Sequence, residues 1–276
     1  MDKGVDITAL AKMTDNYSGA EIESVVKNAA SRALQEQLSS SKKNIKDEDI
    51  IVNMDHFIKA VDEISPSFGN INKKIATLLP TKYVNLDYTH IVCYNGINNF
   101  IKNSKRLKTI LVVGESGTGK TTLVTKIAFD NKIKYTKMIR AIDMVTFDEY
   151  GKAAFIVDNV TNAYVSEESL VILDDVEIAI NYANLGNNVT FSNKLYQTLV
   201  TLLKSEPTTL NHKLTLIVTC GDVEFARMIS KFFDMVYHVG SVQAANVSSV
   251  VKMLSCNNKL QFGDIDMTIK EILNLI

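Results

Sequence analysis

The chain has 276 residues, of which 46% are hydrophobic and 22% charged, and its net charge is −1 at pH 7. This composition is typical of one or two globular domains and excludes a chain that is mostly disordered or membrane-embedded. The balanced charge gives no electrostatic sign of nucleic-acid binding, which would need a clear basic excess. The three cysteines, Cys93, Cys220 and Cys256, lie far apart and form no CxxC pair, so neither a disulfide framework nor a zinc site is predicted.

The N-terminus lacks the basic start and apolar core of a signal peptide. The longest apolar runs span only a few residues, whereas a membrane helix needs about 20. We therefore expect a cytoplasmic chain without membrane insertion.

The first 68 residues are predicted to be helical. Ser18 and Glu21 have the spacing of a capping box, in which each side chain accepts a hydrogen bond from the other's backbone amide, and apolar residues recur behind them at helical intervals. A second amphipathic helix is expected to begin at Met54. It should end near Pro66, because proline lacks the amide donor that a helix uses.

Residues 83–240 are predicted to form an α/β core, preceded by a linker at 69–82 and followed by a helical segment at 241–276. Short apolar runs alternate with helical patterns, which indicates a parallel sheet with helices on both faces. The expected strands are residues 109–113, 170–173, 214–219 and 235–239. The expected helices are residues 97–102, 121–129, 155–164 and 195–203.

The segment between the first expected strand and the next helix matches the phosphate-binding motif G-x-x-x-x-G-K-[ST] in full. Its glycines let backbone amides turn toward phosphates, and the helix that follows contributes the positive end of its dipole. Lys120 is expected to reach the outer phosphates of ATP, and the Thr121 hydroxyl to bind Mg²⁺. The predicted nucleotide-binding residues of this P-loop are Gly114, Glu115, Ser116, Gly117, Thr118, Gly119, Lys120, Thr121 and Thr122.

A second expected strand ends in two carboxylates, Asp174 and Asp175, about 50 residues after the P-loop, the order typical of P-loop ATPases. Asp174 is expected to hold Mg²⁺ together with Thr121. Asp175 is expected to polarise the attacking water, and its short side chain predicts slow hydrolysis, because many such ATPases have a glutamate there. These two aspartates are the predicted catalytic residues.

The run from Thr14 to Ile22, which contains Tyr17-Ser18-Gly19-Ala20-Glu21, resembles the lid subdomain of AAA ATPases. Residues 55–69 resemble the end of the same lid. The resemblance implies that residues 1–68 are the lid of a preceding AAA module. It also implies that residues 83–240 are the nucleotide-binding core of a second module, and residues 241–276 the start of its own, truncated lid.

Several short runs of the second module resemble the SNARE-disassembling branch of the family, the group of N-ethylmaleimide-sensitive factor. The resemblance implies a homo-hexameric ring in which this module binds ATP tightly and hydrolyses it slowly, and in which Lys270 contacts the γ-phosphate. It also implies action on SNARE complexes through adaptor proteins, in a cytoplasmic protein peripheral to transport-vesicle and Golgi membranes. The runs are Leu173-Asp174-Asp175-Val176-Glu177, Phe191-Ser192-Asn193, Leu202-Leu203-Lys204 and Ile269-Lys270-Glu271-Ile272-Leu273.

Two further departures from the usual AAA pattern agree with weak hydrolysis. Gly221 stands where many modules have a polar sensor residue, and Arg227 is the only arginine between residues 206 and 239, so paired arginine fingers are not expected. Lys204 and Lys213 are candidates to supply part of the positive charge that arginine fingers would bring. Two alternatives remain open: an active double-ring unfoldase of another AAA group, and an interaction module that no longer binds nucleotide.

Overall fold

The computed structural model describes residues 2, 4–14, 17–39, 51–64, 88–133, 135–186, 188–241 and 269–270. It divides into two compact units, Met1–Asn70 and Ile71–Ile276. The predicted linker at 69–82, the first residues of the predicted core at 83–87, and all of the predicted second lid except residues 241 and 269–270 lie outside the described residues.

The first unit is helical, as its sequence predicts, and contains α1 (Ile7–Met13), α2 (Gly19–Ser39) and α3 (Met54–Glu63). The capping box is present: Glu21 accepts from the Ser18 backbone N–H at 2.7 Å, and the Glu21 N–H donates to Ser18 Oγ at 3.3 Å. The small core between α2 and α3 is built from Val25, Ala29, Phe57, Ala60 and Val61.

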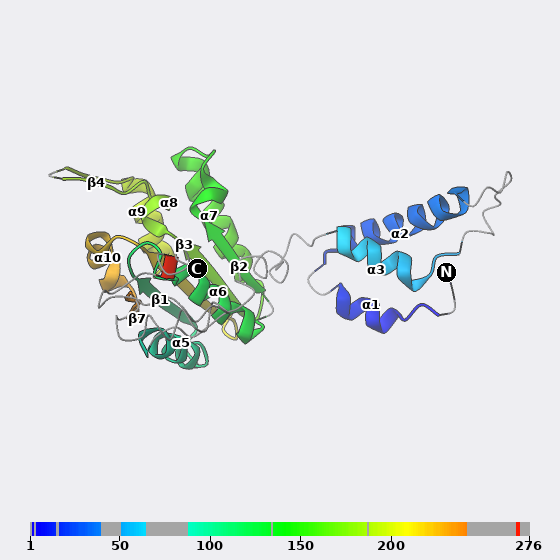
Figure 1. Cartoon of the computed structure of the whole chain (residues 1–276), viewed down its shortest axis with the longest axis horizontal. Coiled ribbons are helices and arrows are strands. Elements are labelled where there is room, and N and C mark those ends of the chain that lie inside the picture. The colour runs from blue at the N-terminus through cyan, green and yellow to red at the C-terminus, as the bar shows by residue number, and fades with distance from the viewer. Residues whose placement is uncertain are drawn as a thin grey trace, which may run out of the picture. The chain divides into compact units, whose positions relative to one another are not determined.

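The second unit is built on a five-stranded parallel sheet with the strand order β2-β3-β6-β1-β7 (Figure 1), so the predicted α/β class is confirmed. Its strands are β1 (Leu107–Val113), β2 (Tyr135–Arg140), β3 (Glu168–Asp174), β6 (Lys213–Cys220) and β7 (Met235–His238). A separate two-stranded hairpin consists of β4 (Ala183–Leu185) and β5 (Asn188–Thr190).

The helices of the second unit alternate with its strands along the chain. They are α5 (Tyr88–Ile101), α6 (Lys120–Asn131), α7 (Glu149–Ala163), α8 (Val176–Ala179), α9 (Asn193–Leu202) and α10 (Val223–Ile229), with single turns of 3-10 helix at Ala141–Met144 and Ser230–Phe232. Successive side chains of a strand point to opposite faces, and every residue of β1 is buried. One face of the sheet packs on α5 and α6 through a core that includes Ile97, Ile110, Val112, Leu123, Ile127 and Ile172.

The sequence predicts the main strands but misplaces or misses several elements. The short helix predicted at 97–102 is wrong in extent, because α5 already begins at Tyr88. β1 begins at Leu107 rather than at residue 109, since the buried Lys108 ammonium donates to the carbonyl of Ile101 at the end of α5. Strand β2 and helix α10 were not predicted from the sequence, because β2 contains two cationic residues and α10 is only seven residues long.

Strand β7 lies at the edge of the sheet and is fastened to β1 by Asp234. Oδ2 of Asp234 accepts from the Thr109 backbone N–H at 3.0 Å and from Thr109 Oγ1 at 3.1 Å, and Oδ1 accepts from Lys105. Burial alone would raise the pKa of the Asp234 carboxyl, but the bonds from Lys105 and Thr109 outweigh it and hold that pKa below its usual range.

We expect Asp234→Asn to lower the free energy of unfolding by about 1–2 kcal/mol at neutral pH, because it removes a charged acceptor from three donors. Because the pKa of Asp234 is lower in the folded than in the unfolded chain, the carboxylate stabilises the fold fully at pH values above its unfolded pKa. This stabilisation is lost as the pH falls through the pKa of the folded state. Urea unfolding from about pH 7 to about pH 3 should show the difference from the wild type shrinking toward acid. Asp158→Asn, at an exposed position of α7, is the control and should change little; an equal loss there would contradict the prediction.

Candidate functional site

The P-loop leaves the carboxyl end of β1 and enters α6, and two of its glycines are required by geometry. Gly119 precedes α6 with φ 86°, a left-handed conformation that side chains other than glycine rarely adopt. A Cβ on Gly114 would lie 2.3 Å from the carbonyl oxygen of Val239, so only glycine lets the loop pass the end of the sheet. The backbone can therefore wrap closely around a bound group.

The loop is held in shape by bonds to its own carbonyls. Lys120 Nζ and Thr118 Oγ1 each donate to the carbonyl of Glu115 at 2.9 Å. The ring Nε2 of buried His90, on α5, lies 2.9 Å from the carbonyl oxygen of Thr118 and therefore donates its proton there. His90 was missed from the sequence, because a single histidine with no partner at a known spacing gives no signal.

A chain of hydrogen bonds joins the P-loop helix to two strand ends. Thr121 Oγ1 donates to the Asp174 carboxylate, 2.9 Å from Oδ1 and 3.1 Å from Oδ2. Thr219 Oγ1, at the end of β6, donates to Asp174 Oδ1 at 2.7 Å and accepts from the backbone N–H of Asp175 at 2.9 Å. Burial raises the pKa of the Asp174 carboxyl, although the bond from Thr219 opposes the rise.

This group of oxygens suits a small hard cation. Mg²⁺ prefers oxygen ligands and is usually held by one or two carboxylates together with substrate phosphates. The sequence-predicted pair, Thr121 and Asp174, is in direct contact and offers a hydroxyl and a carboxylate. Thr219 was not predicted, but its position at the end of a buried strand next to the acidic one is a usable signal.

The segment after β3, which includes α8, brings two further acidic residues to the site. Asp175 has φ 52° and ψ 61° and directly precedes α8. Two residues on, the Glu177 carboxylate accepts from the backbone N–H of Gly221 at 2.8 Å. Burial raises the pKa of Glu177, and the bonds from its own backbone N–H and from the Gly221 N–H only partly offset this. Glu177 was not among the site residues predicted from the sequence.

A pocket of about 570 Å³ lies between these segments. Of the residues predicted from the sequence, Ser116, Gly117, Gly119, Lys120, Thr121, Thr122, Asp175 and Lys270 line it. Lys270 comes from far along the chain, and its backbone N–H donates to the carbonyl of Gly117 at 3.2 Å. Gly114, Glu115, Thr118 and Asp174 do not line the pocket. The first three shape the loop, and the buried Asp174 reaches the site through its bond to Thr121. Glu177, Ile178, Gly221, Asp222 and Ile269 complete the lining.

Three cationic residues were considered as groups that one subunit could insert into the nucleotide site of its neighbour, and all three lie elsewhere in the unit. Lys213 opens β6, at the opposite end of that strand from Thr219 and Gly221. Lys204 Nζ lies 5.2 Å from the centre of the Phe232 ring, and Arg227 is exposed on α10. In this chain none of the three lines the phosphate pocket.

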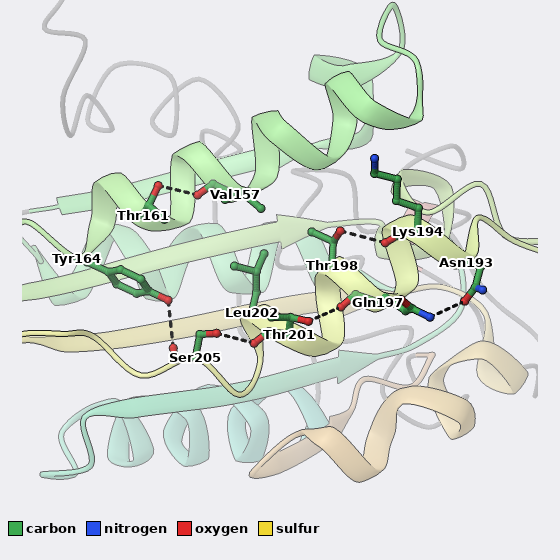
Figure 2. A pocket seen from close by; sticks show the side chains of 10 residues that line it. All are labelled: Val157, Thr161, Tyr164, Asn193, Lys194, Gln197, Thr198, Thr201, Leu202 and Ser205. Atoms are coloured by element: carbon green, nitrogen blue, oxygen red, sulfur yellow. Dashed lines mark hydrogen bonds between the residues drawn. The ribbon is translucent and has the colours of Figure 1, made fainter.

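A second hollow, a groove of about 670 Å³, runs between α7 and α9 (Figure 2). Its walls carry mainly hydroxyl and amide side chains that bond to their own helices, such as Thr161 to the Val157 carbonyl, and Tyr164 donates to the Ser205 carbonyl at 3.1 Å. Lys194 is the one charged side chain in the lining. The groove contains no group of the predicted site.

Within the described ranges, no three histidine, cysteine or acidic side chains come together as a metal-binding cluster. No helix in these ranges has the length and apolar character needed to cross a bilayer.

Segments of both units match known protein families. Residues 4–52 match the AAA+ lid domain, and residues 110–239 match the ATPase family associated with various cellular activities (AAA). Both matched segments belong to the AAA ATPase family. The match to the AAA core covers the P-loop, the Asp174–Thr121 bond and the end of β7.

The curated relatives of this AAA chain are proteins of vesicle fusion. A vesicle-fusing ATPase of Arabidopsis thaliana is 33% identical over 289 residues, which cover 99% of this chain and 38% of the relative. One from Dictyostelium discoideum is 30% identical, covering 100% and 39%. Vesicular-fusion protein sec18 of Schizosaccharomyces pombe is 29% identical, covering 92% and 32%. The chain thus spans between about a third and two fifths of the length of these relatives.

We expect Thr219→Val to weaken Mg²⁺-dependent ATP binding by about 10- to 100-fold, because it removes the donor that orients Asp174 and the acceptor of the Asp175 amide. Titration with a fluorescent ATP analogue, with and without Mg²⁺, measures the effect. Thr215→Val changes another buried threonine of β6 and should leave the affinity near that of the wild type. Equal losses in the two variants would show a general disturbance of the strand.

Proposed function

We propose that this chain is the ATP-binding, ring-forming AAA module of a SNARE-disassembling ATPase in vesicle transport, and that it hydrolyses ATP slowly. The observation that carries the proposal is the direct bond between Thr121 of the P-loop helix and Asp174 at the end of β3, beside the Lys120 ammonium. A P-loop with a lysine and a bonded Thr–Asp pair is the arrangement that binds nucleotide triphosphate with Mg²⁺.

Each residue has a defined task in this proposal. The amides of Ser116 to Thr122 and the positive end of α6 face the phosphates, and Lys120 exchanges the Glu115 carbonyl for an outer phosphate oxygen. Thr121 and Asp174 hold Mg²⁺, which when bound neutralises charge on the phosphates. Lys270 supplies a further positive charge from the pocket wall.

Slow hydrolysis is proposed because the site lacks two usual aids. The residue after Asp174 is an aspartate rather than a glutamate, and no arginine lines the pocket among the described residues. An arginine inserted into such a site can raise the rate by about 10³- to 10⁵-fold. With little turnover, bound ATP stabilises the folded and assembled state, since a ligand that binds only that state shifts the equilibrium toward it.

The proposed hexamer and the proposed SNARE substrate rest on the similarity of this chain to vesicle-fusing ATPases. We propose a homo-hexameric ring that acts on SNARE complexes through adaptor proteins. We also propose a cytoplasmic location, peripheral to transport-vesicle and Golgi membranes, because such a protein would reach them through its partners.

The test compares Lys120→Ala with wild-type chain in ATP titrations followed by light scattering. The wild type should shift toward a hexameric mass as ATP binds, with almost no phosphate release. Lys120→Ala should bind ATP about 10- to 100-fold more weakly, because charge-assisted bonds to the phosphates are lost, and should not assemble at the same concentration.

Lys126→Ala is the matched control, since it removes a lysine from the same helix but outside the pocket lining. It should bind and assemble like the wild type. Assembly of the wild type without ATP, or unchanged binding by Lys120→Ala, would refute the structural role of ATP. Fast sustained phosphate release would instead make the chain an active remodelling ATPase.

A further inference from the structure

We propose that His90 is a positioning residue of the phosphate site: its ring N–H holds the Thr118 carbonyl away from the pocket and thereby turns the Gly119 amide toward the phosphates. This rests on the proposed function, because it names a residue outside the P-loop that prepares the loop for ATP. The inference stands on the bond from His90 to the Thr118 carbonyl and on the geometry of one peptide group.

The bond from His90 fixes the orientation of the Thr118–Gly119 peptide group. His90 Nε2 lies 2.9 Å from the Thr118 carbonyl oxygen, and both residues are buried and outside the pocket lining. The peptide bond is trans, so the Gly119 N–H points away from the Thr118 carbonyl. Gly119 itself lines the pocket. An amide that faces the pocket at this position can donate to a phosphate oxygen.

Helix α5 holds the His90 ring in a fixed place. His90 lies in the first turn of α5, and Ile97, two turns later, is fully buried in the core that covers one face of the sheet. Cys93 Sγ donates to the carbonyl of His238 at the end of β7, 3.4 Å away. Because these contacts anchor α5 to the sheet, its first turn cannot move away from the P-loop without disturbing the core.

A second element binds the adjacent carbonyl of the P-loop. The Lys270 backbone N–H donates to the Gly117 carbonyl at 3.2 Å. A Cβ built on Gly119 would lie 2.7 Å from Ile269 Cδ1 and 3.8 Å from His90 Nε2, so both side chains lie against the same side of Gly119. Two elements far apart in sequence thus restrict the conformations of the loop. A site that is already ordered loses less conformational entropy when its ligand binds.

Packing alone does not account for a histidine at this position. The His90 side chain is buried, and its other ring nitrogen, Nδ1, has no hydrogen-bond partner among the described residues. A buried polar atom without a partner costs free energy, whereas a ring of carbon atoms would fill the same space without that cost. What the imidazole adds is the Nε2 donor, and the Thr118 carbonyl receives it.

The experiment compares His90→Phe with His90→Gln. Phenylalanine keeps an aromatic ring but has no donor, so it should weaken ATP binding by about 10-fold. The side-chain amide nitrogen of glutamine is the same number of bonds from Cα as Nε2 of histidine. Glutamine can therefore donate to the Thr118 carbonyl again and should bind ATP within about threefold of the wild type. Calorimetric titration with Mg²⁺ and ATP measures the affinities, and thermal unfolding without nucleotide shows that each variant is folded.

Tyr94→Phe is the matched control. Tyr94 lies on the same helix and donates to Asp130 of α6, so loss of its hydroxyl removes a bond between α5 and α6 and leaves the Thr118 carbonyl bound to His90. This variant should bind ATP like the wild type.

Unchanged ATP binding by folded His90→Phe would overturn the inference. So would equal losses in His90→Phe and His90→Gln, because the ring would then act by filling space and not as a donor. An equal loss in Tyr94→Phe would also overturn it, because the seating of α5 would then matter and not the bond to Thr118. In these cases the proposed ATP site would stand.

Absence of ATP binding by the wild-type chain would instead refute the proposed function itself. If His90→Phe does not fold, His90→Met takes its place, because methionine also lacks a donor and its flexible side chain adapts to the space. It too should bind ATP about 10-fold more weakly than the wild type, and unchanged binding would overturn the inference.

Discussion

The hydrogen-bond chain from Thr121 through Asp174 to Thr219 is the interaction on which the rest of the site depends. It links the first turn of α6 to the carboxyl ends of β3 and β6, so one buried carboxylate fixes three segments that are far apart in sequence. A buried carboxylate is costly unless it is hydrogen-bonded, and the two threonine hydroxyls supply those bonds. The same oxygens would bind a metal ion with the substrate phosphates.

Sheet register sets this arrangement. Leu173 of β3 pairs with Val218 of β6, and Val113 of β1 pairs with both Cys220 and His238. Because neighbouring strands end at the same level, the P-loop, the acidic pair and the Gly221 loop meet at one edge. Open parallel sheets bind ligands at the carboxyl ends of their strands for this reason.

Much of the fold followed from the sequence, because apolar strands and the P-loop string depend on local patterns. The helix at 121–129 and the strand at 170–173 were found for that reason. Thr121 and Asp174 were expected only to serve one Mg²⁺ site, and the structure adds a direct hydrogen bond between them. Elements defined by tertiary contacts were not: β2 forms a strand by pairing with β3 although it contains Lys137 and Arg140. Glu177 and Gly221 illustrate the same limit, because only the folded chain brings an acid of α8 to the backbone amide that follows β6.

The most direct test of the account is calorimetric titration of the wild-type chain with ATP, in the presence and absence of Mg²⁺. If Thr121 and Asp174, which are hydrogen-bonded to each other, hold the cation together with the phosphates as we propose, binding should saturate at one ATP per chain and be much tighter with Mg²⁺. Binding that is absent, or equally tight without Mg²⁺, would contradict the claim that these residues form a Mg²⁺–ATP site.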